Sequence, residues 1–285
     1  DYIIDIMENT HPIFLEDVPE SYYIAKNELL TASNQGMTVG ELQYKVSRYL
    51  SSINDGHTAL WWEENMFLDI DWKYLDGNLY LLDSNKKLTD KVVTKIGDIE
   101  IGKIIESIRA HFPAENYVAE AKNIERFLKG KLVLENVGVD CAKDILVTLS
   151  NGEEDKILEV EFISGSEYRS VNNGIYSKVI DKNIAYIRLG TCEINSTLKS
   201  VIENIEKYKS EGIKDYIIDV IDNPGGDSNA CSMLLEALNM KGGAYGGMLR
   251  FSPLAQDQRG YLRKSGHIEY KSNNNAVKNN DINLY

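Results

Sequence analysis

The chain has 285 residues, of which 43% are hydrophobic and 26% charged, and its 31 Lys and Arg against 44 Asp and Glu give a net charge of −13. This composition is typical of a globular protein with room for two or more domains. The negative charge argues against nucleic acid and against an anionic membrane surface as the main partner, and no apolar run approaches the roughly 18 residues of a membrane span.

Residues 1–60 predict a helical region. The segments "YIIDIMENTHPIF" and "TVGELQYKVSRYLSSI" carry apolar residues at three- and four-residue spacing, and Thr38 with Glu41 resembles a helix N-cap followed by its capping glutamate. The region ends in Asp55-Gly56-His57-Thr58, where we expect Gly56 to cap the last helix.

Residues 61–170 predict a compact β-rich module with one helix. Asp76-Gly77-Asn78 and Asn151-Gly152 each separate two apolar segments, as hairpin turns do. Between them, "KVVTKIGDIEIGKIIESIRAHF" reads as a strand, a tight turn at Gly97-Asp98, a short strand and a helix.

Residues 171–285 predict an alternating α/β unit. Strands are expected at 183–190 and 214–221, with an amphipathic helix at 196–212 between them and another helix after Gly226. A crossover of this length favours parallel strands, whose carboxyl ends usually carry the functional loops.

Asn223-Pro224-Gly225-Gly226 lies at such an end. Proline fixes its own φ and restrains the residue before it, while two glycines permit close approach to a ligand. Consecutive backbone N–H groups near a helix start can accept negative charge, so the loop suits a carbonyl oxygen that becomes an oxyanion. The alternative is a plain connecting turn; the sequence matches neither a Walker loop nor the dinucleotide fingerprint.

His57 is displayed at a corner of the chain and is suited to proton transfer near neutral pH, although a lone histidine is as often a structural or surface group. No cofactor or metal is expected, because the histidines lack close partners at ligand spacing. The cysteines are few and widely spaced, which fits neither a disulfide framework nor a zinc site, so we expect them to be buried apolar residues. The histidines are His11, His57, His111 and His267, and the cysteines are Cys141, Cys192 and Cys231.

The two motifs and the module between them resemble the tail-specific, or C-terminal processing, serine peptidases and their tricorn-core-like relatives. The resemblance implies an α/β fold, α+β overall: a crotonase-like βαβ catalytic core at 171–285, with N-terminal helices and an inserted PDZ-like module at 61–170. It implies that His57 is the general base and that Gly225 and Gly226 supply the oxyanion hole. The family also suggests an extracytoplasmic or secreted location.

The nucleophile departs from the family pattern. The family places it at a later strand-to-helix corner, often Ser-Ala, and "NNDINLY" at 279–285 reads as the start of that strand, so we expect the serine beyond Tyr285 and the chain as given to be inactive. The alternative nucleophiles within the chain are weak candidates. A serine and a histidine that are close in sequence do not establish a catalytic geometry, and nothing in the sequence near Cys231 would lower its pKa. These alternatives are Ser228, Ser232, Ser265 beside His267, and Cys231.

The expected function is a serine endopeptidase that cleaves protein or peptide substrates through an acyl-enzyme. His57 favours the serine-histidine branch over the serine-lysine branch. Two alternatives remain open: a non-catalytic relative that binds peptides through the PDZ-like module, and a crotonase-type acyl-CoA enzyme, which would not explain the histidine motif or the module.

Overall fold

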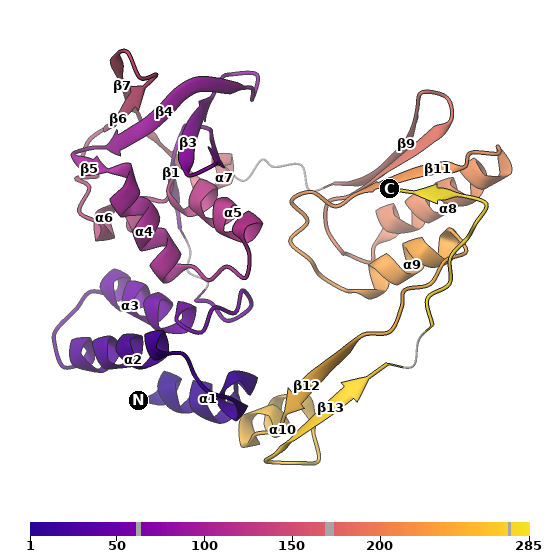
Figure 1. Ribbon diagram of the computed structural model, residues 1–285, viewed down its shortest axis with the longest axis horizontal. Helices are drawn as coiled ribbons and strands as arrows, with labels where there is room; N and C mark the ends of the chain where they lie inside the picture. The colour runs from indigo at the N-terminus through magenta and orange to yellow at the C-terminus, as the bar shows by residue number, and fades with distance from the viewer. Residues whose placement is uncertain (61–63, 169–173, 273–274) are drawn as a thin grey trace. The chain divides into compact units, whose positions relative to one another are not determined.

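The computed structural model describes residues 1–60, 64–168, 174–272 and 275–285 (Figure 1). The chain divides into two compact units, Asp1–Ser170 and Val171–Tyr285, and each is described by itself. None of the described helices is both long and apolar enough to span a membrane.

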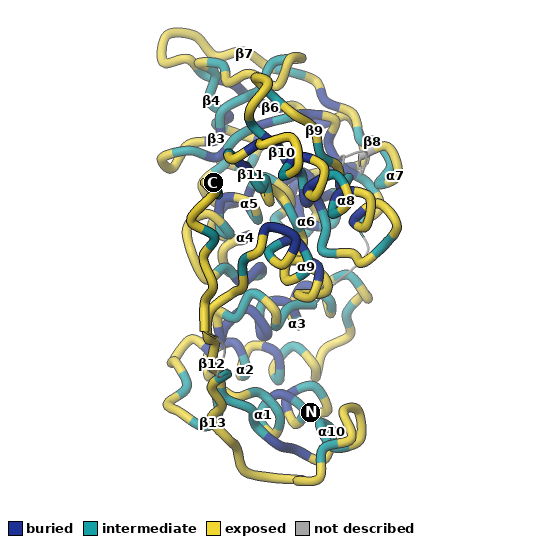
Figure 2. The backbone as a smooth tube through the Cα atoms, turned by 90° about the vertical axis from the view of Figure 1, so that its right-hand side faces the viewer, coloured by how far each residue is buried: buried dark blue, intermediate teal, exposed yellow. Residues whose placement is uncertain are grey.

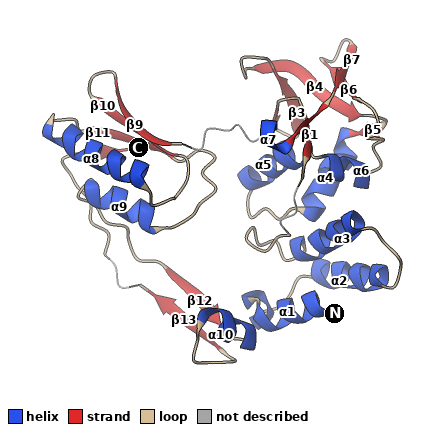
Figure 3. Ribbon diagram, turned by 180° about the vertical axis from the view of Figure 1, so that it is seen from behind, coloured by secondary structure: helices blue, strands red, loops and turns tan. Residues whose placement is uncertain are grey.

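The first unit begins with helices, as the periodicity predicts (Figure 3). Thr38 and Glu41 form the predicted capping box, because the threonine side chain accepts from the backbone N–H of Glu41 and the glutamate side chain accepts from that of Thr38. Burial of one face of each helix builds a small apolar core that includes Tyr22, Leu29 and Tyr49. The elements are α1 (Tyr2–Thr10), a 3-10 turn (Pro12–Leu15), α2 (Glu20–Ser33) and α3 (Val39–Ser51).

The rest of the first unit is a mixed module around an antiparallel sheet of order β2-β3-β4-β6-β7, with β5 paired to β4. The predicted hairpin at Asp76-Gly77-Asn78 has a turn in which Asp76 and Gly77 both have positive φ, and Gly152 has positive φ at the second predicted turn. The module contains more helix than expected, since α5 and α6 join α4, and short strands β1 and β8 pair beside them.

The strands of the module are β1 (Met66–Leu68), β2 (Trp72–Leu75), β3 (Asn78–Leu82), β4 (Leu88–Ile96), β5 (Ile99–Glu100), β6 (Ile145–Ser150), β7 (Asp155–Val160) and β8 (Phe162–Ser164). Its helices are α4 (Ile101–His111), α5 (Tyr117–Phe127), α6 (Lys131–Asn136) and the short α7 (Gly165–Tyr168). The sheet and the helices enclose one large core, which contains the only fully buried cysteine, Cys141. The other two cysteines are half-buried (Cys192) or exposed (Cys231), so the expectation of three buried cysteines is wrong.

The second unit is a four-stranded sheet of order β14-β11-β10-β9. The predicted strand-helix-strand-helix is confirmed as β10 (Ile184–Leu189), α8 (Ser196–Ser210), β11 (Asp215–Asp219) and α9 (Asn229–Ala237). β10 and β11 are parallel, and Ala185, Ile187 and Leu189 alternate into a core beneath α8 and α9. Figure 2 colours the backbone by how far each residue is buried.

The remaining strands of the second unit extend this sheet at its two edges or form a separate ribbon. β14 (Asn283–Leu284) pairs in parallel with β11, where the sequence predicts a new strand. β9 (Ile175–Ile180) adds an antiparallel edge, and a ribbon of β12 (Gly246–Arg250) and β13 (His267–Lys271) with α10 (Pro253–Arg259) completes the unit.

Candidate functional site

The Asn223–Gly226 loop follows β11 after a turn and is anchored to the end of the neighbouring strand. The side-chain amide of Asn223 donates to the carbonyl oxygen of Leu189, the last residue of β10, at 2.7 Å. Its Oδ1 accepts from the backbone N–H of Gly225 at 2.7 Å. One asparagine thus fixes the loop at the carboxyl ends of both parallel strands, where ligand sites are common in such sheets.

Cys192 holds the glycine pair from the other side. Its backbone N–H donates to the carbonyl oxygen of Gly225, and its carbonyl oxygen accepts from the N–H of Asp227, both at 2.9 Å. Gly226 therefore lies flat against Cys192 with φ of +133°, and a Cβ at this position would stand 2.7 Å from the Cys192 carbonyl oxygen. Glycine is required here for its backbone conformation and for the close approach.

The two glycine N–H groups are not equivalent. That of Gly225 already donates to Asn223, whereas no group in the described part of the chain accepts from the N–H of the exposed Gly226. Helix α9 begins only at Asn229, whose N–H donates to Asp227 Oδ1 at 2.9 Å. Ser228 occupies the N-cap position, but its hydroxyl makes no capping bond.

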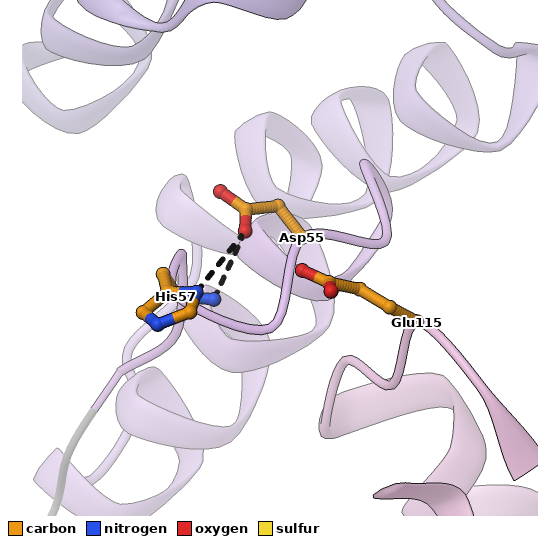
Figure 4. A group of neighbouring side chains, drawn as sticks. All are labelled: Asp55, His57 and Glu115. Atoms are coloured by element: carbon orange, nitrogen blue, oxygen red, sulfur yellow. Dashed lines mark hydrogen bonds and ion pairs between the residues drawn. The ribbon is translucent and has the colours of Figure 1, made fainter. Parts of the chain in front are cut away.

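His57 lies in the first unit, in the loop after α3. The expectation that Gly56 caps this helix is wrong: α3 ends at Ser51, and Asn54 takes the left-handed conformation instead, with φ of 54°. The side chain of His57 is 98% exposed. Its Nδ1 is 4.0 Å from Asp55 Oδ1, and its backbone N–H donates to that same oxygen at 3.0 Å (Figure 4).

The carboxylate of Asp55 makes several of the hydrogen bonds that hold this loop in place. Its Oδ2 accepts from the Thr58 hydroxyl at 2.6 Å and lies 3.0 Å from Nε2 of His11. Burial acts to raise the pKa of Asp55, but the hydrogen bonds from Thr58, from His11 and from the backbone of His57 outweigh it and lower the pKa to about 2. The carboxylate therefore stays charged at neutral pH and can orient groups around it.

Glu115 joins the same loop from the segment between α4 and α5. Its Oε1 accepts from the backbone N–H of Gly56 at 3.0 Å. One ligand atom each from Asp55, His57 and Glu115 lies within 4.8 Å of the others, an arrangement that could receive a divalent cation. Both carboxylates already accept hydrogen bonds from the protein, so the cluster is explained without a metal.

Sequence reasoning missed His11 and Glu115 as partners of the histidine motif, since they are 44 and 59 residues away from the groups they bind. No local signal marks such contacts. The alternative nucleophiles gain no support, because Ser228, Ser232 and Ser265 form no hydrogen bond with a histidine in the described ranges. His57 and the Asn223–Gly226 loop belong to different units.

Comparison with known proteins confirms the resemblance that the motifs predict. The sequence model of peptidase family S41 matches residues 183–246, which run from β10 through the glycine pair to the start of β12. The match includes Gly225 and Gly226 but not His57. No curated protein matches the chain significantly.

Solved structures of CPAF share the fold. Mature CPAF is 11% identical to the chain, with a TM-score of 0.58 over 90% of this chain and 60% of CPAF. Mature CPAF complexed with lactacystin is 10% identical, with a TM-score of 0.56 over 90% and 61%. The chain therefore spans about three fifths of the length of these structures, and at this identity the likeness concerns the fold alone.

Proposed function

We propose that the chain is part of a serine-type endopeptidase that cleaves protein or peptide substrates through an acyl-enzyme. The family match over residues 183–246 supports the peptidase class. The observation that carries the proposal is the Asn223–Gly226 loop, which holds, at the carboxyl end of a parallel strand, a backbone N–H that donates to no described group. Such a donor is what a tetrahedral oxyanion requires.

In this proposal Gly226 supplies the primary oxyanion donor. Its N–H donates to none of the residues that the structure describes, and its position is fixed by the two hydrogen bonds between Cys192 and the neighbours of Gly226. Gly225 would contribute only after its N–H leaves Asn223 Oδ1, to which it now donates. A fixed donor needs no reorganisation during the reaction, and one such donor contributes about 3–4 kcal/mol of transition-state stabilisation in comparable sites.

His57 serves as the general base and takes the proton from the nucleophilic serine, which we place beyond Tyr285. The parallel pairing of β14 with β11 supports this placement, because it begins the strand that leads to the nucleophile in the resemblance. The side chain of His57 is 98% exposed and can therefore meet a serine, and the carboxylate of Asp55 lies 4.0 Å from its Nδ1, where it can orient the ring.

The test uses the full-length protein. Fluorophosphonate labelling identifies the activated serine, and cleavage of peptide substrates is compared for the wild-type protein, His57→Ala and His267→Ala. His267 is an exposed histidine on β13 and serves as the matched control. We expect His57→Ala to lower kcat/KM by about 10²-fold or more and His267→Ala to leave it unchanged.

Undiminished cleavage by His57→Ala would exclude this histidine as the base. Absence of both labelling and cleavage, together with peptide binding, would instead support the non-catalytic alternative.

A further inference from the structure

The strongest unassigned feature of the described chain is a pair of free cysteines beside the glycine loop. Cys192 follows β10, and Cys231 lies in the first turn of α9. Their sulfur atoms are 3.9 Å apart although 39 residues separate them in sequence. Neither sequence pattern nor family match assigns a role to this pair.

Each cysteine has a distinct environment. Cys231 is exposed and can meet a reagent in solution, whereas Cys192 is half-buried against the loop. The Sγ of Cys192 is 3.5 Å from the amide nitrogen of Asn223 and 3.7 Å from its Oδ1. Cys192 therefore contacts the loop through both its side chain and its backbone.

We propose that Cys192 and Cys231 form a reversible disulfide that displaces the Asn223–Gly226 loop and lowers peptidase activity. The regulatory part rests on the proposed function, whereas disulfide formation does not. A disulfide bond is about 2.05 Å long, so the two sulfurs have to approach by roughly 1.9 Å. Moving the Cys192 sulfur away from Asn223 removes a contact that orients the side chain on which the N–H of Gly225 depends.

The displacement reaches the oxyanion donor through the backbone. The N–H and the carbonyl oxygen of Cys192 are bonded to Gly225 and Asp227, on either side of Gly226. In the proposal the backbone of Cys192 follows its sulfur, and a shift of that backbone would move this segment or break those bonds. Because catalysis depends steeply on the position of such groups, a shift of about 1 Å lowers the rate by about 10²-fold.

The oxidant is a low-molecular-weight disulfide such as oxidised glutathione. The thiolate of Cys231 attacks one sulfur of the oxidant and releases one reduced thiol, which leaves a mixed disulfide on Cys231. The thiolate of Cys192 then attacks that Cys231 sulfur and releases the second thiol. The two cysteines lose two protons and two electrons, and the oxidant is reduced to two thiols.

The protonation state of the Cys192 and Cys231 thiols determines the pH at which the disulfide forms. Burial raises the pKa of the Cys231 thiol, and its hydrogen bond with Cys192 raises it further. Since the thiolate is the nucleophile, we expect oxidation to accelerate as the pH rises through the alkaline range. The buried Cys141 serves as an internal control, because burial raises the pKa of its thiol to about 11 and keeps it from reagents.

The first experiment measures the covalent step on this chain. After treatment with oxidised glutathione, intact mass should fall by two hydrogens, the number of alkylatable thiols in the denatured protein should drop from three to one, and peptide mapping should join Cys192 to Cys231. Cys231→Ser should abolish the bond. Persistent glutathione adducts, intermolecular dimers or a bond to Cys141 in the wild-type chain would overturn the proposal.

The second experiment measures the coupling to the loop. In amide NMR spectra, the signals of Gly225 and Gly226 should shift on oxidation of the wild-type chain and return on reduction, with no shift in Cys231→Ser. Unchanged glycine signals in the oxidised chain would refute the coupling even if the disulfide forms.

The third experiment measures regulation in the full-length protein. Oxidation should lower peptide cleavage by about 10-fold or more, dithiothreitol should restore it, and Cys231→Ser should be active and insensitive. Full activity of the oxidised protein would overturn the regulatory part. If neither redox form cleaves peptides, the proposed function fails, while the mass and NMR results still decide whether the disulfide forms and moves the loop.

Discussion

Replacing Gly226 by alanine tests the geometry on which the site depends. Its φ of +133° belongs to a conformation that is essentially restricted to glycine, and forcing another residue into it costs about 1–3 kcal/mol. The added Cβ would stand 2.7 Å from the carbonyl oxygen and 3.0 Å from the carbonyl carbon of Cys192, both backbone atoms that cannot rotate away. Overpacking of this kind costs about 1–3 kcal/mol more.

We therefore expect Gly226→Ala to destabilise the second unit by about 2–6 kcal/mol. Gly225→Ala is the matched control: φ is also positive, at 96°, but nothing lies within 4 Å of the added Cβ, so only about 1–2 kcal/mol is expected. The difference in the free energy of unfolding between the two variants therefore measures the effect of the contact between residue 226 and Cys192.

Hydrogen–deuterium exchange measures the effect, because amides of β10, β11 and α9 should lose protection in Gly226→Ala more than in Gly225→Ala. All three tryptophans, Trp61, Trp62 and Trp72, lie in the first unit, so the denaturant midpoint of tryptophan fluorescence reports whether that unit is intact. Equal loss of protection in both variants, or none in Gly226→Ala, would refute the close packing of Gly226 on Cys192.

Three further predictions concern the first unit and use urea unfolding followed by tryptophan fluorescence. Because the pKa of Asp55 is lowered to about 2 in the folded chain, Asp55→Asn should lower the free energy of unfolding by about 2 kcal/mol at pH 5 and above. The difference between the two proteins should shrink as the pH falls towards 2, and a difference that stays constant would contradict the stabilising role of the carboxylate. Burial lowers the pKa of His111 to about 4, so the unfolded state takes up a proton at a higher pH than the folded state does. The free energy of unfolding of the wild-type chain should therefore fall by roughly 3 kcal/mol between pH 6.5 and 4. His111→Phe should lack this part of the pH dependence. An unchanged slope would show that His111 is not the titrating group. Gly102 lies in α4 with nothing within 4 Å of an added Cβ, so Gly102→Ala should stabilise the unit by about 0.4–1 kcal/mol, and destabilisation would mean that the helix is strained there.

Local features followed from the sequence because they depend on neighbouring residues. The hairpin at Asp76-Gly77 and the capping box at Thr38 are set by the conformations and hydrogen bonds of adjacent groups. The strand-helix-strand around α8 follows from hydrophobic periodicity, and its length favoured the parallel pairing of β10 with β11. The glycine loop was therefore placed correctly at the end of β11.

The tertiary structure decided which groups in the site are bound and which are available. Asn223 meets Leu189 across 34 residues, and the sulfur of Cys192 meets that of Cys231 across 39, distances over which periodicity carries no information. Which partner a polar group finds depends on strand register and on how α9 packs, and these are fixed only when the whole sheet forms. For this reason the sequence determined that two glycines follow the strand, and only the fold distinguished the N–H of Gly225, which donates to Asn223, from that of Gly226, which donates to no described group.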